Sequence, residues 1–413
     1  MTTNPYPLRR VSDAEFAPWC RMIADTYGQD LTEADLAIKR AATDLDRTIG
    51  AFDGPTPVGG VSIYPRVLTV PGAQLPTAGI AFVGVAPTHR RRGILTSMMR
   101  RQLAELHEHG AEPIAALRPA EAGIYGRYGY GAASRGMALC VDKRAMTFRP
   151  EVDFGDGSIA QLEPGEARSV MEKLYDRRRP TTAGWSDRDD SAWDLRLVDP
   201  PERRGNATAL RVAVHTASSG DITGYALYRR EHNPDGSRTV RLLELVTLDL
   251  PGYAALWRFF AGFDLTDWIE YEAAVDEALP QLLIDPRPAN AALLDRLWVR
   301  LIDVDRALAG RRYSAPLRTV LDIEDATCPW NTGRFRLLAD GEEVSCERTA
   351  DPAELRLSVS ELGAAYLGGT SLTSLAAAGL VAELWPGALS RVDAAFRTHR
   401  EPFYPGGWAF PLY

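Results

Sequence analysis

The sequence predicts mixed α/β units that are followed by an α+β domain. Strand and helix patterns alternate up to about residue 145, and the same order begins again near Ser158. The last part of the chain changes to alternating strands and then short helices. The length of 413 residues is roughly 2.75 times a domain of about 150 residues, so two or three domains each have room for a core.

The expected elements of the first unit are strands at residues 8–11, 47–52, 58–64, 80–85 and 114–117 and a helix at residues 94–106. Ser12 and Glu15 have capping-box spacing, which predicts a further helix after the first strand. Asp53 and Gly54 predict the turn of a hairpin between the second and third strands. Gly110 suits the position just after a helix.

The second unit is expected to contain strands at residues 211–214, 222–228 and 240–248 and helices around residues 166–175 and 254–263. Residues 148–157 are rich in Pro, Gly and charge, which is typical of a joint between domains. The repeated order favours a degenerate second copy of the first unit. One large insertion is the alternative.

The third unit is expected to contain strands at residues 317–323, 333–338, 343–346 and 354–358 and three short helical segments that end at residues 392–396. Asp340 and Gly341 predict a hairpin turn, and Ser360 precedes the helical segments. This arrangement is α+β.

The charge balance argues against nucleic acid and anionic membranes as partners. Lys and Arg number 47 and Asp and Glu 55, which gives a formal charge of -8. A small cationic amine is the expected partner, and Asp25 and Asp30, near the end of the first helix, are candidates to attract it.

Cys20, Cys140, Cys328 and Cys346 lie far apart without a C-x-x-C pair, so packed, reduced thiols are expected. The six His show no metal-ligand spacing, so no metal is predicted. The sequence shows no signal peptide and no long apolar stretch, which predicts a cytoplasmic protein.

One segment, residues 82–96, carries the strongest functional signal. Its apolar strand runs into the basic loop Arg90-Arg91-Arg92-Gly93, which opens an amphipathic helix. The first N–H groups of a helix lack partners inside it, and Gly93 lets an anion approach the backbone closely. The segment therefore predicts a pyrophosphate site. A solvated basic turn is the alternative for the loop taken alone.

The same segment resembles motif A of the GCN5-related N-acetyltransferase (GNAT) superfamily, in which Val-x-Val precedes Arg/Gln-x-x-Gly-x-Gly/Ala. The matching residues are Val83-Gly84-Val85 and Arg90-Arg91-Arg92-Gly93-Ile94-Leu95, with Leu95 in place of the final small residue. Residues 120–131 resemble the Ser-Glu-x-x-Ile-Tyr-Gly-Arg-Phe-Gly-Tyr-Gly run of the Eis (enhanced intracellular survival) acetyltransferases. Those enzymes also carry the Pro-Thr-His-Arg-Arg-Arg-Gly found at residues 87–93.

The resemblance implies two tandem GNAT-like mixed-sheet domains and a sterol-carrier-protein-like α+β domain, which we place at residues 1–147, 148–292 and 293–413. It implies acetyl transfer from acetyl-CoA to aminoglycoside, polyamine-like or lysine amines, and a homo-oligomer, namely a hexamer. The residues assigned to acetyl-CoA are Val83, Gly84, Val85, Arg90, Arg91, Arg92, Gly93, Ile94, Leu95, Thr96, Ala120 and Glu121.

Tyr125 is the candidate acid for the departing thiolate, because it follows the strand that would flank acetyl-CoA. A phenol with a pKa of about 10 can donate to a thiolate whose conjugate acid has a pKa near 8.5. The alternative is that Tyr125 is one more packed aromatic beside Tyr128 and Tyr130.

Residues 403–413 are so apolar and aromatic that we expect them to dock against the protein. The Eis resemblance implies that the carboxylate of the final aromatic residue, here Tyr413, is the general base. Burial would raise the pKa of such a carboxyl from about 3.3–3.7. A hydrophobic anchor is the alternative.

The second unit has Asp249 where the first has its basic loop, so one active site per chain is expected. The preferred interpretation is an acetyl-CoA-dependent N-acetyltransferase that acts on cationic amines. The alternative is a non-enzymatic protein that binds acyl-CoA and an apolar ligand.

Overall fold

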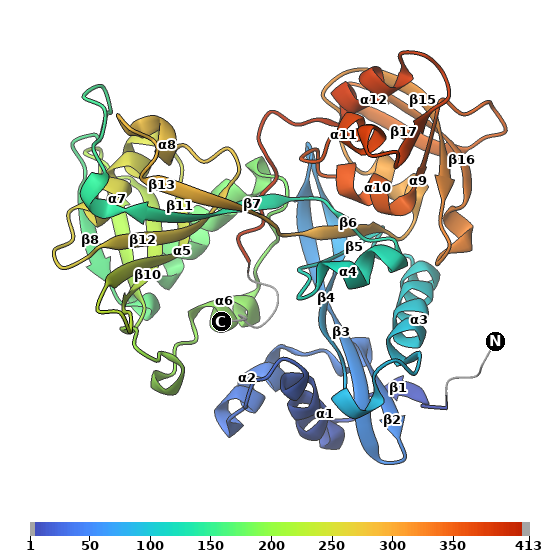
Figure 1. Cartoon of the computed structure of the whole chain (residues 1–413), viewed down its shortest axis with the longest axis horizontal. Helices are drawn as coiled ribbons and strands as arrows, with labels where there is room; N and C mark the ends of the chain where they lie inside the picture. The colour runs from blue at the N-terminus through green and yellow to red at the C-terminus, as the bar shows by residue number, and fades with distance from the viewer. Residues whose placement is uncertain (1–4, 407–413) are drawn as a thin grey trace.

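The computed structural model of the chain describes residues 5–406, and three sheets organise these residues (Figure 1). The predicted combination of two mixed α/β units and a final α+β unit is confirmed. In Figure 1 the second unit lies on one side, and the first and third units lie on the other.

The first sheet has the strand order β1-β2-β3-β4-β5-β14-β6. Its strands are β1 (Leu8–Arg10), β2 (Thr48–Asp53), β3 (Thr56–Val70), β4 (Ala73–Val85), β5 (Ile114–Leu117), β14 (Trp298–Leu301) and β6 (Gly131–Ala132). The helices of this unit are α1 (Asp13–Thr26), α2 (Glu33–Ala42), α3 (Ile94–His109) and α4 (Ala122–Tyr125).

Two adjacent glycines on β3 show that α1 and α3 cover opposite faces of this sheet. A Cβ atom at Gly59 would lie 2.9 Å from the side chain of Ile94 on α3, and one at Gly60 would lie 2.2 Å from Trp19 on α1. Successive residues of a strand point to opposite faces, so each glycine lets one helix approach the sheet closely.

The second sheet has the order β13-β7-β12-β11-β10-β9-β8. Its strands are β13 (Ala289–Asp295), β7 (Arg135–Asp142), β12 (Trp268–Ala274), β11 (Arg238–Thr247), β10 (Ile222–His232), β9 (Arg211–Thr216) and β8 (Ser158–Leu162). Its helices are α5 (Pro164–Arg178), α6 (Asp190–Leu197), α7 (Leu250–Ala261) and α8 (Leu279–Leu282).

The first two sheets include strands from beyond the predicted domain bounds. β7 belongs to the predicted first domain but pairs with β12 and β13 in the second sheet. β14 belongs to the predicted third domain but pairs with β5 and β6 in the first sheet. Pairing between such distant segments has no local signal, because sequence patterns report periodicity and turns rather than partners.

The third sheet has the order β17-β16-β15-β18-β19. Its strands are β17 (Glu343–Arg348), β16 (Gly333–Asp340), β15 (Leu317–Glu324), β18 (Leu355–Ser358) and β19 (Val381–Glu383). The helices of this unit are α9 (Val304–Ala309), α10 (Val359–Ala365), α11 (Leu372–Ala377) and α12 (Ala388–Phe396). One buried cluster joins this unit to the first sheet, since Leu68 and Val299 pack in the same core as Phe335 and Phe396.

Most local signals in the sequence describe the structure correctly. Ser12 and Glu15 form a capping box at the start of α1, and Gly110 ends α3 with a φ of 63°. The predicted start of the last helical part is displaced, because the side chain of Ser358, and not Ser360, caps α10. All four cysteines are free.

Candidate active site

The open end of β4 is the first feature of the site. β4 pairs with β5 only from Thr77 to Gly79, whereas its pairing with β3 continues to Val85. A bulge falls at this end, where Phe82 has a φ of 53°. The two parallel strands therefore diverge and leave one edge of β4 open beyond Gly79.

Two of the predicted positions on this edge contact α1 or the residue that follows it. The carbonyl oxygen of Val83 accepts a hydrogen bond from the Tyr27 hydroxyl at 2.7 Å. A Cβ atom at Gly84 would lie 2.8 Å from Thr26 Oγ1, so this glycine admits α1. Val83 lines the chamber described below.

The basic loop, residues 90–93, leads from β4 into α3. Arg91 and Gly93 have φ values of 61° and 81°, and no side chain caps the start of α3 at Gly93. Arg90, Arg91 and Arg92 are all exposed, and Arg92 Nη1 also donates to the Tyr6 hydroxyl at 2.5 Å. Uncapped N–H groups and the two exposed arginines without this contact, Arg90 and Arg91, form an arrangement that can hold a pyrophosphate.

Residues 94–96 follow the loop in the first turn of α3. The Ile94 side chain is buried against the first sheet, and Leu95 packs at the edge of the same core. Thr96 Oγ1 lies 3.1 Å from the Tyr128 hydroxyl. The backbone N–H groups of these three residues belong to the uncapped first turn of α3, and the side chains of Ile94 and Leu95 pack in the core.

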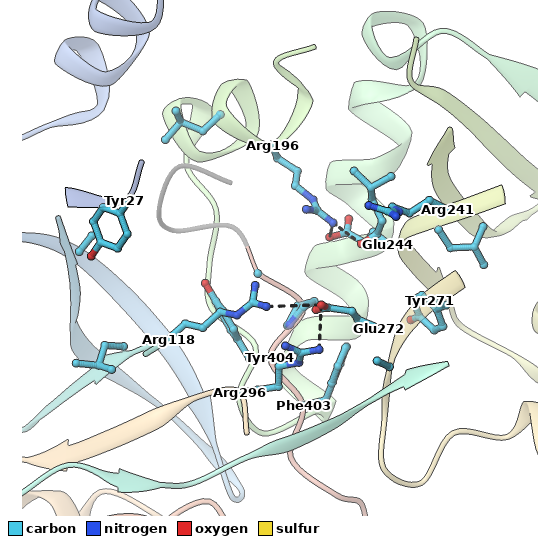
Figure 2. Close-up of a pocket in the computed structure, with 18 of the residues that line it drawn as sticks. Tyr27, Arg118, Arg196, Arg241, Glu244, Tyr271, Glu272, Arg296, Phe403 and Tyr404 are labelled. Carbon is cyan, nitrogen blue, oxygen red and sulfur yellow. Dashed lines mark hydrogen bonds and ion pairs between the residues drawn. The ribbon is translucent and has the colours of Figure 1, made fainter. Parts of the chain in front are cut away.

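A chamber of about 830 Å³ lies between the first and second units (Figure 2). Tyr27, Val83 and Tyr125 line it from the first unit, and residues of β7, β11 and β12 line it from the second. Residues 403–406 also line it. The chamber therefore begins beside the open edge of β4.

Tyr125 reaches the chamber, whereas Tyr128 and Tyr130 are not part of its lining. Burial raises the pKa of the Tyr125 phenol above its ordinary value of 10, with smaller contributions from Tyr27 and Glu121. The Tyr125 ring packs against Tyr130 with centroids 6.0 Å apart. Tyr125 is thus both a packed aromatic and a protonated phenol that faces the chamber. Ala120 and Glu121 are exposed just before α4 and do not line the chamber.

The charges of the chamber differ from the sequence prediction. Asp25 and Asp30 are not among its lining residues. The basic lining side chains are Lys39, Arg118, Arg196, Arg241 and Arg296. The acidic ones are Glu244, Glu270 and Glu272. These residues come from distant parts of the chain, so no local pattern marks them as a group.

Each acidic lining residue already pairs with arginine. Glu244 lies 3.3 Å from Arg196, Glu270 3.0 Å from Arg241 and Glu272 2.9 Å from Arg296. Burial alone would raise the pKa of Glu244, but Arg188 and Arg196 lower it to about 2. The chamber walls are therefore held by ion pairs and carry more basic than acidic side chains.

The second unit lacks the corresponding anion site. Asp249 Oδ1 accepts a hydrogen bond from the Gly252 N–H at 2.8 Å at the start of α7. A carboxylate thus occupies the helix end that an anionic cofactor would need. This supports the prediction of one site per chain.

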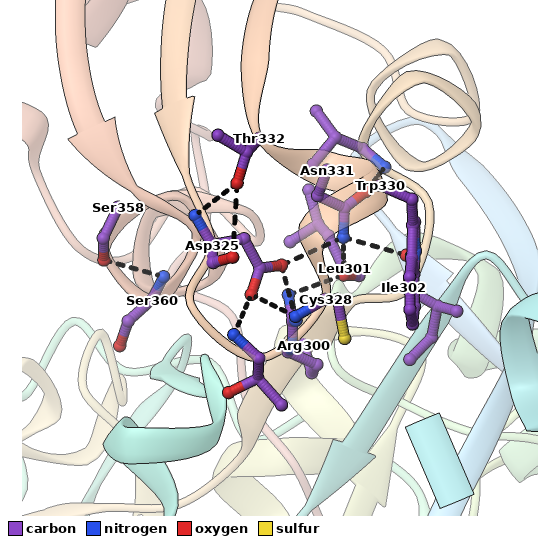
Figure 3. Close-up of polar contacts among 12 residues, drawn as sticks. Arg300, Leu301, Ile302, Asp325, Cys328, Trp330, Asn331, Thr332, Ser358 and Ser360 are labelled. Carbon is purple, nitrogen blue, oxygen red and sulfur yellow. Dashed lines mark hydrogen bonds and ion pairs between the residues drawn. The ribbon is translucent and has the colours of Figure 1, made fainter. Parts of the chain in front are cut away.

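A buried ion pair lies behind the segment that carries Tyr125 (Figure 3). Arg300 Nη2 on β14 lies 2.6 Å from Asp325 Oδ2, and both side chains are at most 1% exposed. A Cβ atom at Gly129 would lie 2.8 Å from Arg300 Nε. The pair therefore supports the chain just after Tyr125 and joins the first sheet to the third unit.

Within residues 5–406, no helix has the length and apolar character needed to cross a membrane. In the same part of the chain, no cluster of three or more His, Cys, Asp or Glu could bind a metal ion. Tyr413, the predicted base, lies outside the described residues.

Each of the three units matches a known protein-domain family. Residues 7–133 and residues 184–301 each match an acetyltransferase (GNAT) domain family. Residues 304–405 match the sterol carrier protein domain.

Full-length relatives show the same relationship. An N-acetyltransferase of Streptomyces avermitilis is 43% identical over 372 residues, which cover 89% of this chain and 90% of that protein. The N-acetyltransferase Eis of Mycobacterium tuberculosis is 36% identical over 372 residues, which cover 86% of this chain and 88% of that protein.

Solved structures are also similar to this chain over nearly its whole length. The crystal structure of Eis1 from Mycobacterium abscessus has 31% identity and a TM-score of 0.83, and the match covers 97% of this chain and 100% of that one. A GCN5-related N-acetyltransferase from Anabaena variabilis has 21% identity and a TM-score of 0.85, with 97% and 99% covered, which shows a shared fold.

Proposed function

The chain belongs to the Eis-type N-acetyltransferases of the GNAT superfamily, and on that premise we propose that it transfers acetyl from acetyl-CoA to a primary amine in the chamber. The observation that carries this proposal is the open edge of β4, which runs between the basic loop and the chamber. This edge gives an extended cofactor a path from a pyrophosphate site to the acceptor.

The donor would be held mainly by backbone and by two arginines. Arg90 and Arg91 are exposed beside the uncapped start of α3 and would neutralise the pyrophosphate. Gly93 supplies the left-handed backbone that the loop requires. The thioester would then point along β4 toward Tyr125.

The reaction forms one carbon–nitrogen bond and breaks one carbon–sulfur bond. The neutral amine attacks the thioester carbonyl carbon, and the sulfur leaves with the bonding electron pair. The nitrogen loses a proton to a base, and the sulfur gains one from an acid. Tyr125 is the candidate acid because it lines the same chamber as the open edge and its phenol is protonated at neutral pH.

We assign the base to the carboxylate of Tyr413, as the Eis resemblance implies. The position of residues 403–406 supports this assignment, because all four line the chamber. An adjacent carboxylate would act on the amine mainly through its proximity.

Amine-dependent release of free CoA thiol from acetyl-CoA tests the proposal. The panel of acceptors includes aminoglycosides, polyamines and lysine peptides, which are the acceptors that the sequence predicts. Tyr125→Phe is expected to lower kcat by about 10²-fold, which is the usual scale for a lost general acid. Tyr130→Phe is the matched control, because that neighbouring buried hydroxyl has no hydrogen-bond partner within residues 5–406.

No release with any amine would refute the proposal and favour the binding-only alternative. Equal loss in the Tyr125 and Tyr130 variants would remove Tyr125 from the acid role.

Two further expectations accompany this function. The four free cysteines suit a reducing compartment, so we place the enzyme in the cytoplasm. The hexamer implied by the resemblance is a prediction that sedimentation analysis can check.

A further inference from the structure

We propose that Arg188 is a positioning residue that fixes residues 403–406, and with them the start of the C-terminal segment that carries the base, at the chamber. The proposal rests on the proposed function, because it takes the C-terminal carboxylate as the base. Arg188 belongs to the second unit and lies 218 residues before Gly406, the residue that it contacts.

The guanidinium group of Arg188 is itself held from several sides. Its side chain is fully buried, and its Nη1 and Nη2 atoms donate to the two carboxylate oxygens of Glu244 at 3.0 and 2.5 Å. The same group lies 3.9 Å from the ring centroid of Tyr175 and 4.8 Å from that of Trp193. A guanidinium fixed in this way is a preorganised donor, because little side-chain freedom remains to be lost when it binds.

This fixed donor contacts the last residue that the structure describes. Arg188 Nη2 donates to the carbonyl oxygen of Gly406 at 3.1 Å. Hydrogen bonds from a charged donor are stronger than those between neutral groups. Arg188 therefore fixes the point from which residues 407–413 continue.

The backbone just before Arg188 lies between β3 and the end of the described chain. On one side the Gly184 N–H donates to the carbonyl oxygen of Thr69 on β3 at 2.8 Å. On the other side the Phe403 N–H donates to the carbonyl oxygen of Ala183 at 2.9 Å. A Cβ atom at Gly184 would lie 2.7 Å from the Phe403 carbonyl oxygen, so the two backbones are in close contact.

The side chains of Phe403 and Tyr404 pack in different cores. Phe403 packs with Trp185 in a buried cluster of the second unit, whereas Tyr404 belongs to the cluster that joins the first sheet to the third unit. Figure 2 shows both residues at the chamber. These contacts hold the segment in register, and the contact with Arg188 fixes its end.

Gly184→Ala tests whether displacing this segment slows the reaction, and Gly220→Ala is the matched control. The two glycines have φ values of 95° and 90°, but a Cβ atom at Gly220 would meet no atom within 4 Å. Gly184→Ala is expected to lower kcat by about tenfold or more, because a small misplacement of a reacting group is costly, and to leave the KM for acetyl-CoA unchanged. Gly220→Ala is expected to keep kcat within about twofold of the parent enzyme.

Arg188→Lys tests the side chain directly. Lysine keeps a positive charge beside Glu244 but lacks the planar fork that reaches both this carboxylate and Gly406, so kcat is expected to fall by about tenfold. Arg229→Lys is the control with the same change. Arg229 is also buried and lies 3.1 Å from a carboxylate, that of Asp199, but it is outside the described lining of the chamber.

Two further measurements separate positioning from a general structural effect. In a protein extended by a few residues after Tyr413 the carboxylate is displaced, so adding Gly184→Ala should change kcat by less than about twofold. Amide hydrogen exchange at Phe403, whose N–H donates to Ala183, should become faster in Gly184→Ala and stay unchanged in Gly220→Ala.

Several results would overturn the inference. They are an unchanged kcat in the Gly184 and Arg188 variants, unchanged exchange at Phe403 in Gly184→Ala, or the same loss of kcat from Gly184→Ala with and without the extension. If one of the two variants does not fold, the other provides the same test. Full turnover by the extended parent protein would instead refute the C-terminal base, which is part of the proposed function.

Discussion

Replacing Asp325 by asparagine is expected to destabilise the protein strongly, because the buried guanidinium of Arg300 would lose its counter-charge. Asp325 Oδ2 also accepts from Asn331, and Oδ1 accepts from the N–H groups of Thr327 and Cys328. Asparagine has a single oxygen, so its NH₂ group would face donors on one side (Figure 3).

The size of the effect follows from burial. Removing one partner of a fully buried ion pair costs about 3–5 kcal/mol, because an unpaired charge remains in the interior. At about 2–4 °C per kcal/mol for a cooperative unit of 150–250 residues, this corresponds to a Tm lower by about 6–20 °C. Urea unfolding followed by tryptophan fluorescence measures the same loss.

A double-mutant cycle measures the interaction energy between Arg300 and Asp325 apart from their contacts with other residues. Arg300→Met should cost a similar amount, and the double variant should cost less than the sum of the two single variants. Asp325→Asn with stability within about 1 kcal/mol of the parent protein would refute the reasoning.

Three other predictions concern the site and its walls. Gly93→Ala should raise the KM for acetyl-CoA and leave the KM for the amine unchanged in initial-rate kinetics, because a φ of 81° costs an L-residue about 1–2 kcal/mol; unchanged donor affinity would remove the loop from the site. The stability advantage of the parent protein over Glu244→Gln should be complete above pH 4.5 and shrink as pH falls toward 2, because the folded-state pKa of Glu244 is about 2; melts at several pH values with a constant difference would contradict this. Adding a few residues after Tyr413 should reduce kcat while the fold is retained by circular dichroism, and full turnover would exclude its carboxylate as the base.

Local chemistry in the sequence was enough to predict many elements. The Asp53-Gly54 turn, the Ser12 cap and the helix end at Gly110 each depend on residues within one turn of the chain. The pyrophosphate loop is also local, since strand, loop and helix are contiguous.

The chamber could not be predicted from local patterns in the sequence, because its walls come from both acetyltransferase units and from residues 403–406. The chamber wall brings together Arg118, Glu272 and Arg296 only when β7 has joined the second sheet and β14 has joined the first. Net charge and the position of Asp25 and Asp30 therefore pointed to a cationic acceptor, whereas the folded chamber is rich in arginine.

Transfer of acetyl from acetyl-CoA to an amine, followed by mass spectrometry of the acceptor in a single turnover, tests the central claim most directly. We expect the acceptor to gain one acetyl group in step with the appearance of free CoA, and Gly93→Val to abolish both at acetyl-CoA concentrations that saturate the parent enzyme. Release of CoA without an acetylated amine, or undiminished transfer by the Gly93 variant, would contradict the account.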